Sequence, residues 1–301
     1  MNVTNLPKFE YKGVQYARDF VGFDTKNDVG HNLTELAAAS DVYNHNPDEN
    51  DVTNSFGFSN HSDWFSHLRK YYYAAKILSR LKPVRWLDVG CGDLQLPWFL
   101  NKNRFKPEPG CRYFGIDLRA TEGWLTATHN TGPKHRYKAD ITLIRGDIVR
   151  DDFTQVPEWP GRFEVVVCLE VFEHVPRSFA PEFMKRLYDW TLVGGTCLFA
   201  TPNAGVSEST AENHTDPVTH ESREWTFNDK LAMAKDVGFE VQRAFGTFTG
   251  ATYLPLVEQE YLKNDDHWRQ LKEWLSPGDY NCLISVAFPR NSVASLMVLT
   301  K

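Results

Sequence analysis

Residues 86–92, Trp-Leu-Asp-Val-Gly-Cys-Gly, decide the fold of this chain. An apolar run ends beside an acid, and two glycines spaced by one residue follow, which predicts a buried strand breaking into a turn with little side-chain bulk. Gly90 and Gly92 permit positive φ angles and let a ligand approach the backbone. Asp88 places a carboxylate at the base of this turn, where it would repel a pyrophosphate and attract an ammonium or sulfonium group. Gln95 stands where the dinucleotide signature G-x-G-x-x-G requires its third glycine, so the stretch argues against NAD.

Strand-like and helix-like segments alternate along the rest of the chain. Strands are predicted at 112–116, 141–145, 163–169, 196–200, 239–245 and 295–300, and helices at 64–81, 94–101, 178–190 and 226–237, with an irregular helical insert at 253–275. Such alternation implies a parallel sheet with right-handed crossovers, whose ligands bind at the carboxyl edge of the strands. We expect Ser62 or Asp63 to cap the first helix and the polar segment 27–63 to be a loop.

Two further acids stand at the ends of neighbouring predicted strands. Asp117 ends the second strand, where its carboxylate can accept hydrogen bonds from both hydroxyls of a ribose. Asp147 follows the third strand and can accept a hydrogen bond from an adenine amino group. Each acid could equally cap a turn. Together with the glycine turn, the two acids favour a cofactor that contains a nucleoside.

The pattern Asp88-x-Gly90-x-Gly92 at the end of a first strand resembles motif I of the class I methyltransferases that use S-adenosylmethionine. This resemblance extends from about residue 83 to residue 301. It implies an α/β fold, a doubly wound seven-stranded sheet that is mostly parallel with an antiparallel last strand. We expect a methyltransferase domain at 83–301, with inserts at about 203–225 and 247–281, behind an N-terminal extension, 1–82, made of a lid loop and a helix. The residues expected to bind the cofactor are Asp88, Gly90, Cys91, Gly92, Asp117, Leu118, Asp147, Ile148 and Leu169.

The segment after the fourth predicted strand supplies the candidate catalytic residues Glu170, Glu173 and His174. The sulfonium of S-adenosylmethionine already activates its methyl group, so the protein must align the acceptor and needs a base only when the acceptor arrives protonated. The same three side chains could instead converge on one face of a turn and bind a divalent cation, with His220 as a fourth ligand.

The Glu-x-x-Glu-His pattern resembles two families with different acceptors. In small-RNA 2'-O-methyltransferases it holds Mg²⁺ or Mn²⁺, and the ligands carried over to this chain would be Glu170, Glu173, His174 and His220. In many small-molecule methyltransferases, such as those acting on quinone precursors, the pattern binds no metal. The tetrad of the usual DNA amino-methyltransferases is absent, because Cys-Leu-Glu-Val at 168–171 stands in its place.

Composition limits the partners of the chain. A net charge of -6 over 301 residues gives no general basic field, so nucleic acid would require a local patch such as the basic residues between 134 and 150. Five scattered cysteines predict reduced thiols, and the sequence shows neither a signal peptide nor a long apolar run, so we expect a cytoplasmic protein without a membrane partner. We favour a methyltransferase acting on a small molecule; the alternatives are a metal-dependent RNA ribose methyltransferase and a non-catalytic S-adenosylmethionine-binding partner or sensor.

Overall fold

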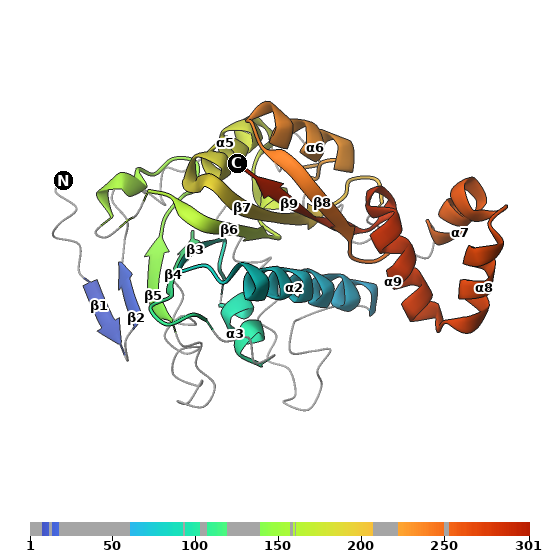
Figure 1. The fold of residues 1–301 in the computed structure, drawn as a ribbon. Helices are drawn as coiled ribbons and strands as arrows, with labels where there is room; N and C mark the ends of the chain where they lie inside the picture. The colour runs from blue at the N-terminus through green and yellow to red at the C-terminus, as the bar shows by residue number, and fades with distance from the viewer. Residues whose placement is uncertain are drawn as a thin grey trace.

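The computed structural model describes residues 8–11, 14–17, 61–92, 94–102, 107–118, 139–156, 159, 161–206, 222–249 and 253–301. These residues form one nine-stranded sheet in the order β1-β2-β5-β4-β3-β6-β7-β9-β8. Helices cover both faces of this sheet, with α2 and α3 on one side and α5 and α6 on the other (Figure 1).

The elements have the following bounds. The strands are β1 (Lys8–Tyr11), β2 (Val14–Ala17), β3 (Arg85–Val89), β4 (Arg112–Asp117), β5 (Asp140–Arg145), β6 (Phe163–Leu169), β7 (Thr191–Pro202), β8 (Glu240–Gly246) and β9 (Ala294–Thr300). The helices are α2 (His61–Leu81), α3 (Gln95–Lys102), α5 (Ala180–Trp190), α6 (Phe227–Asp236), α7 (Leu254–Val257), α8 (Asp266–Trp274) and α9 (Pro277–Ala287). A π-helical turn, η6 (Glu258–Leu262), follows α7, and short 3₁₀ turns include η4 (Phe172–His174), η5 (Arg177–Phe179) and η7 (Pro289–Asn291).

The seven strands that lie between β5 and β8 in the sheet order, these two included, confirm the predicted fold class. Strands β5, β4, β3, β6 and β7 pair in parallel, and β9 runs antiparallel to both of its neighbours, β7 and β8. The hairpin of β1 and β2 extends the sheet beyond β5, to which β2 is parallel. No strand is predicted there from the sequence, because four-residue strands are too short to show a period.

Helix α2 belongs to the same packed core as the sheet. Ala74, Ala75 and Leu78 are buried in a cluster with Trp86 of β3. The expected caps of this helix are wrong, since α2 begins at His61 and therefore includes Ser62 and Asp63. An apolar stripe is readable from the sequence, whereas a polar run in front of it makes several starting points equally plausible.

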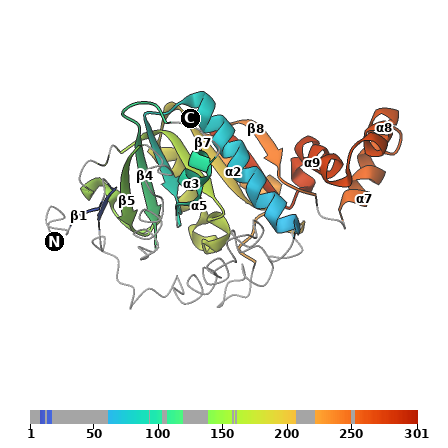
Figure 2. The same ribbon diagram turned by 90° about the horizontal axis from the view of Figure 1, so that it is seen from below.

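A small helical lobe follows β8. The buried residues Val257, Leu262, Tyr280 and Ile284 form its core, and the lobe projects beyond the β8 edge of the sheet (Figures 1 and 2). Helix α9 in this lobe was not predicted, although Ser276, whose hydroxyl accepts a hydrogen bond from the Asp279 N–H, and the proline after it are a helix-start signal.

The five cysteines all carry free thiols, and four of them are buried, as their scattered spacing predicts. Among the helices of the described part of the chain, no helix combines the length and the apolar character needed to cross a membrane.

Candidate active site at the carboxyl edge of the sheet

The glycine turn after β3 combines a closely packed residue with an open one. Gly90 has a φ of 71°, and a Cβ placed on it would lie 2.1 Å from Cγ2 of Val171. Gly92 has a φ of 45°, and, its chain neighbours aside, a Cβ there would meet no atom of the described residues within 4 Å. The N–H groups of Gly90 and Cys91 donate to the carbonyl of Ile116 at 2.8 and 3.0 Å, which ties the turn to β4. Among the described residues, the turn is therefore packed at Gly90 and uncovered at Gly92.

Asp88 lies buried beneath this turn. The hydroxyl of Tyr113 donates a hydrogen bond to its carboxylate at 3.1 Å. Burial raises the pKa of Asp88 to about 7, the negative charge of Asp117 acts in the same direction, and the Tyr113 hydrogen bond opposes them. A cation bound at the turn would favour the ionised carboxylate, so this acid is suited to a positively charged ligand.

Asp117 and Asp147 lie at the same edge, as predicted for acids at adjacent strand ends. Asp117 ends β4, and its carboxylate accepts a hydrogen bond from the Gly92 N–H at 2.9 Å. Asp147 follows β5 and accepts hydrogen bonds from the backbone N–H groups of Val149 at 2.8 Å and Arg150 at 3.2 Å. Asp147 thus caps its own turn, which is the alternative that the sequence left open, and its contact with an adenine stays a prediction.

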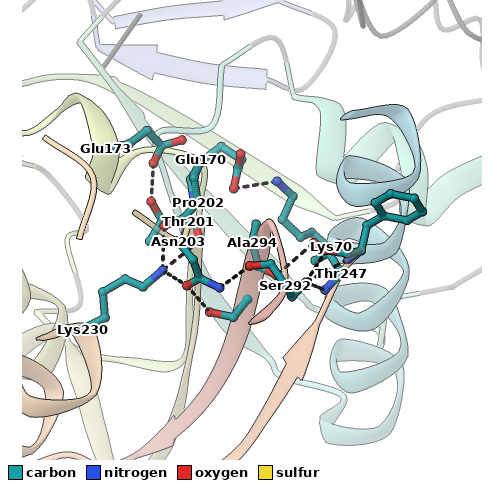
Figure 3. A network of polar contacts seen from close by, with 12 residues as sticks. Lys70, Glu170, Glu173, Thr201, Pro202, Asn203, Lys230, Thr247, Ser292 and Ala294 are labelled. Atoms are coloured by element: carbon teal, nitrogen blue, oxygen red, sulfur yellow. Dashed lines mark hydrogen bonds and ion pairs between the residues drawn. The ribbon is translucent and has the colours of Figure 1, made fainter. Parts of the chain in front are cut away.

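The Glu-x-x-Glu-His segment sends its two carboxylates to different partners. Glu170 forms an ion pair with Lys70 of α2 at 2.6 Å, whereas Glu173 accepts a hydrogen bond from the Thr201 hydroxyl at 2.7 Å (Figure 3). Among the described residues, no three histidine, cysteine or acidic side chains are grouped in a way that could hold a metal ion. The convergence that a metal site would need is therefore not observed for Glu170, Glu173 and His174. His220 lies outside the described residues.

Two buried lysines at this edge were missed by the sequence analysis. Lys70 pairs with Glu170, and Lys230 of α6 donates to the carbonyls of Thr201 and Pro202 at 3.1 and 2.7 Å and to Oδ1 of Asn203 at 2.6 Å (Figure 3). Burial lowers the pKa of Lys230 to about 7, against the opposing effect of nearby glutamates.

A signal for both lysines was present in the helical patterns. Lys70 precedes the buried residues Ala74 and Leu78 by one and two turns, and Lys230 precedes buried Ala234 by one turn. A lysine on the apolar face of a helix must find an oxygen partner when it is buried, so these positions mark a polar site within the core.

Comparisons with known proteins agree with this architecture. A family model described as a methyltransferase domain matches residues 65–286, and the chain belongs to this family. The ubiquinone biosynthesis O-methyltransferase of Pseudomonas paraeruginosa (strain DSM 24068 / PA7) is 27% identical over 188 residues, which are 60% of this chain and 72% of that protein. The corresponding protein of Pseudomonas syringae pv. syringae (strain B728a) is 26% identical over the same length and with the same coverage.

A solved structure shows the same fold. The magnesium protoporphyrin IX methyltransferase of Synechocystis PCC 6803, solved with bound S-adenosylhomocysteine (SAH), matches with a TM-score of 0.51 and 13% identity, over 90% of this chain and 96% of that one. The family match and the fold define the protein as a class I methyltransferase that uses S-adenosylmethionine. This confirms the activity that the Asp-x-Gly-x-Gly turn predicts.

Proposed function

We propose that this enzyme methylates an oxygen atom of a small-molecule acceptor. The cofactor half of the proposal is carried by the open glycine turn with Asp88 and Asp117 beside it. The acceptor half is supported by the relatives, which are O-methyltransferases of ubiquinone biosynthesis, and by the net charge of -6, which gives no general attraction for nucleic acid.

The residues at the turn fit S-adenosylmethionine in charge and in shape. When bound, this cofactor supplies a methyl group activated by a positively charged sulfur. Asp88 offsets the positive charge of the ligand, Asp117 accepts hydrogen bonds from ribose hydroxyls, and the bare backbone of Gly92 permits a close approach. We propose the same cofactor contacts as the sequence predicts: Asp88, Gly90, Cys91, Gly92, Asp117, Leu118, Asp147, Ile148 and Leu169.

The acceptor side is assigned to the segment after β6. The Glu170 side chain is 15% exposed, and its Oε1 is buried against Lys70, so we assign Oε2 to the acceptor. Glu173 is buried against Thr201 and holds the end of β7 in place. His174 is partly exposed in the turn η4. We propose that Glu170 takes the proton of the acceptor hydroxyl, so that the oxygen attacks as an anion, and that His174 of the same segment contacts the acceptor.

A transfer experiment with labelled S-adenosylmethionine tests this function. Purified enzyme is incubated with an extract that is then separated by size and treated with nuclease. Label in the small-molecule fraction, base-stable as expected for a methyl ether, supports the proposal. Label that nuclease releases from large material would refute the small-molecule acceptor, and label on nitrogen or carbon would refute the oxygen.

A further inference from the structure

The ion pair between Lys70 and Glu170 joins a helix near the start of the described chain to the acceptor side of the site. The Lys70 Nζ lies 2.6 Å from Oε1 of Glu170, and the two side chains are 2% and 15% exposed. Removing a charge from water is costly unless a partner of opposite sign is close. The position of α2 is therefore coupled to the position of this carboxylate.

The backbone of Glu170 is held in an uncommon conformation. Its φ of 57° lies in the left-handed region, which is unfavourable for a residue with a Cβ. The Glu170 N–H donates to the Ala200 carbonyl at 2.9 Å, and the next residue, Val171, packs so closely on Gly90 that a Cβ has no room there. Strained residues of this kind persist where the surrounding structure determines them, which is often at active sites. The backbone of Glu170 is thus fixed relative to the glycine turn.

The backbone alone does not fix the carboxylate, because the Glu170 side chain has three rotatable bonds. Lys70 supplies the remaining constraint, because it reaches the Glu170 carboxylate from helix α2 (Figure 3). The other buried lysine, Lys230, donates to oxygens of Thr201, Pro202 and Asn203 and so supports the end of β7. The direct contacts of the two lysines therefore differ: Lys70 pairs with Glu170, and Lys230 binds the oxygens at the end of β7.

We infer that Lys70 is a positioning residue for methyl transfer, which holds the Glu170 carboxylate in the place where it meets the acceptor. This inference rests on the proposed role of Glu170 in the function above. It also means that α2, although it precedes the expected domain boundary at residue 82, completes the active site. The proposed domain boundary between residues 82 and 83 then divides the sequence, but the active site uses residues from both sides of it.

Substitutions on one helix test this role. Lys70→Met removes the charge, Lys70→Arg keeps it, and Lys76→Met is the matched control, because Lys76 is an exposed lysine of α2 whose Nζ lies over the Tyr72 ring. The measured quantities are kcat and KM for methyl transfer to the extract fraction that takes the label, and the Kd for SAH. We expect Lys70→Met to lower kcat roughly tenfold to a hundredfold, as a misplacement of about 1 Å can. The Kd for SAH should change less than about threefold, Lys70→Arg should recover part of kcat, and Lys76→Met should match the wild type.

The double variant Lys70→Met/Glu170→Gln keeps the test decisive if Lys70→Met unfolds. Replacing both charges leaves neither buried without its partner, so the double variant should fold and should be no slower than Glu170→Gln alone. An unchanged kcat in Lys70→Met, or additive losses in the double variant, would overturn the inference. Label found only in RNA would refute the proposed small-molecule acceptor instead. The kcat values of Lys70→Met and Lys76→Met would then be compared with RNA as the acceptor, so the role of Lys70 would still be tested.

Discussion

Alanine substitutions at Gly90 and Gly92 test whether the first glycine is needed for packing and the second for ligand binding. In Gly90→Ala, the left-handed backbone at φ 71° costs roughly 1–2 kcal/mol. The new Cβ would also stand 2.1 Å from Val171 Cγ2, and relief of such an overlap costs about 1–3 kcal/mol. The unfolding free energy should therefore fall by about 2–5 kcal/mol. In Gly92→Ala only the backbone cost of about 1–2 kcal/mol remains, because no described residue other than its chain neighbours has an atom within 4 Å of the added carbon.

Urea unfolding and calorimetric titration with SAH measure the two effects. Gly92→Ala should remain the more stable variant but bind SAH at least about tenfold more weakly, since its methyl group points into the space that the ligand needs. Gly90→Ala/Val171→Ala should recover the overlap part of the loss, which gives a coupling energy of about 1–3 kcal/mol in a double-mutant cycle. Equal destabilisation by the two alanines, or full SAH affinity in Gly92→Ala, would refute the assignment of these roles.

Three further predictions concern charged side chains at or near the site. Because burial raises the pKa of Asp88 to about 7, the affinity for S-adenosylmethionine in calorimetric titrations should rise with pH up to about 7 and then level off. Tyr113→Phe removes a hydrogen bond that lowers this pKa and should move the midpoint of the rise to higher pH. An affinity that does not change with pH would contradict the charge role of Asp88. Burial lowers the pKa of Lys230 from 10.5 to about 7 in the folded state, so between these pH values the unfolded chain binds a proton that the folded chain does not. The unfolding free energy should therefore rise with pH from about 7 to 10.5. Urea unfolding should show this rise in the wild type and not in Lys230→Met. The Arg177 guanidinium donates to the carbonyls of Ser222 and Glu224 and stacks over Trp225 at 4.2 Å, so Arg177→Met should speed hydrogen exchange in this segment, and unchanged exchange would show that the clamp is dispensable.

The glycine turn and the strands around it were readable from local pattern. A strand that is buried on both faces, as β6 is, reads as an unbroken apolar run, and its predicted bounds, 163–169, are those observed. Glycines at positive φ with an acid before them specify a turn through the chemistry of a few neighbouring residues. Such features depend on short stretches of chain, and so does the family resemblance that they carry.

The partners of the buried charges were decided by tertiary structure. No local pattern around Glu170 predicts its pairing with Lys70, which is 100 positions away in the sequence. No local pattern predicts that Lys230 binds the end of β7 either. Spacing alone allowed Glu170 and Glu173 to converge on one ligand, yet in the fold Glu170 pairs with Lys70 of α2 and Glu173 with Thr201 of β7. The local sequence supplies the carboxylates because their positions follow from strand ends, whereas the packing of distant helices decides which cation or hydroxyl each carboxylate meets.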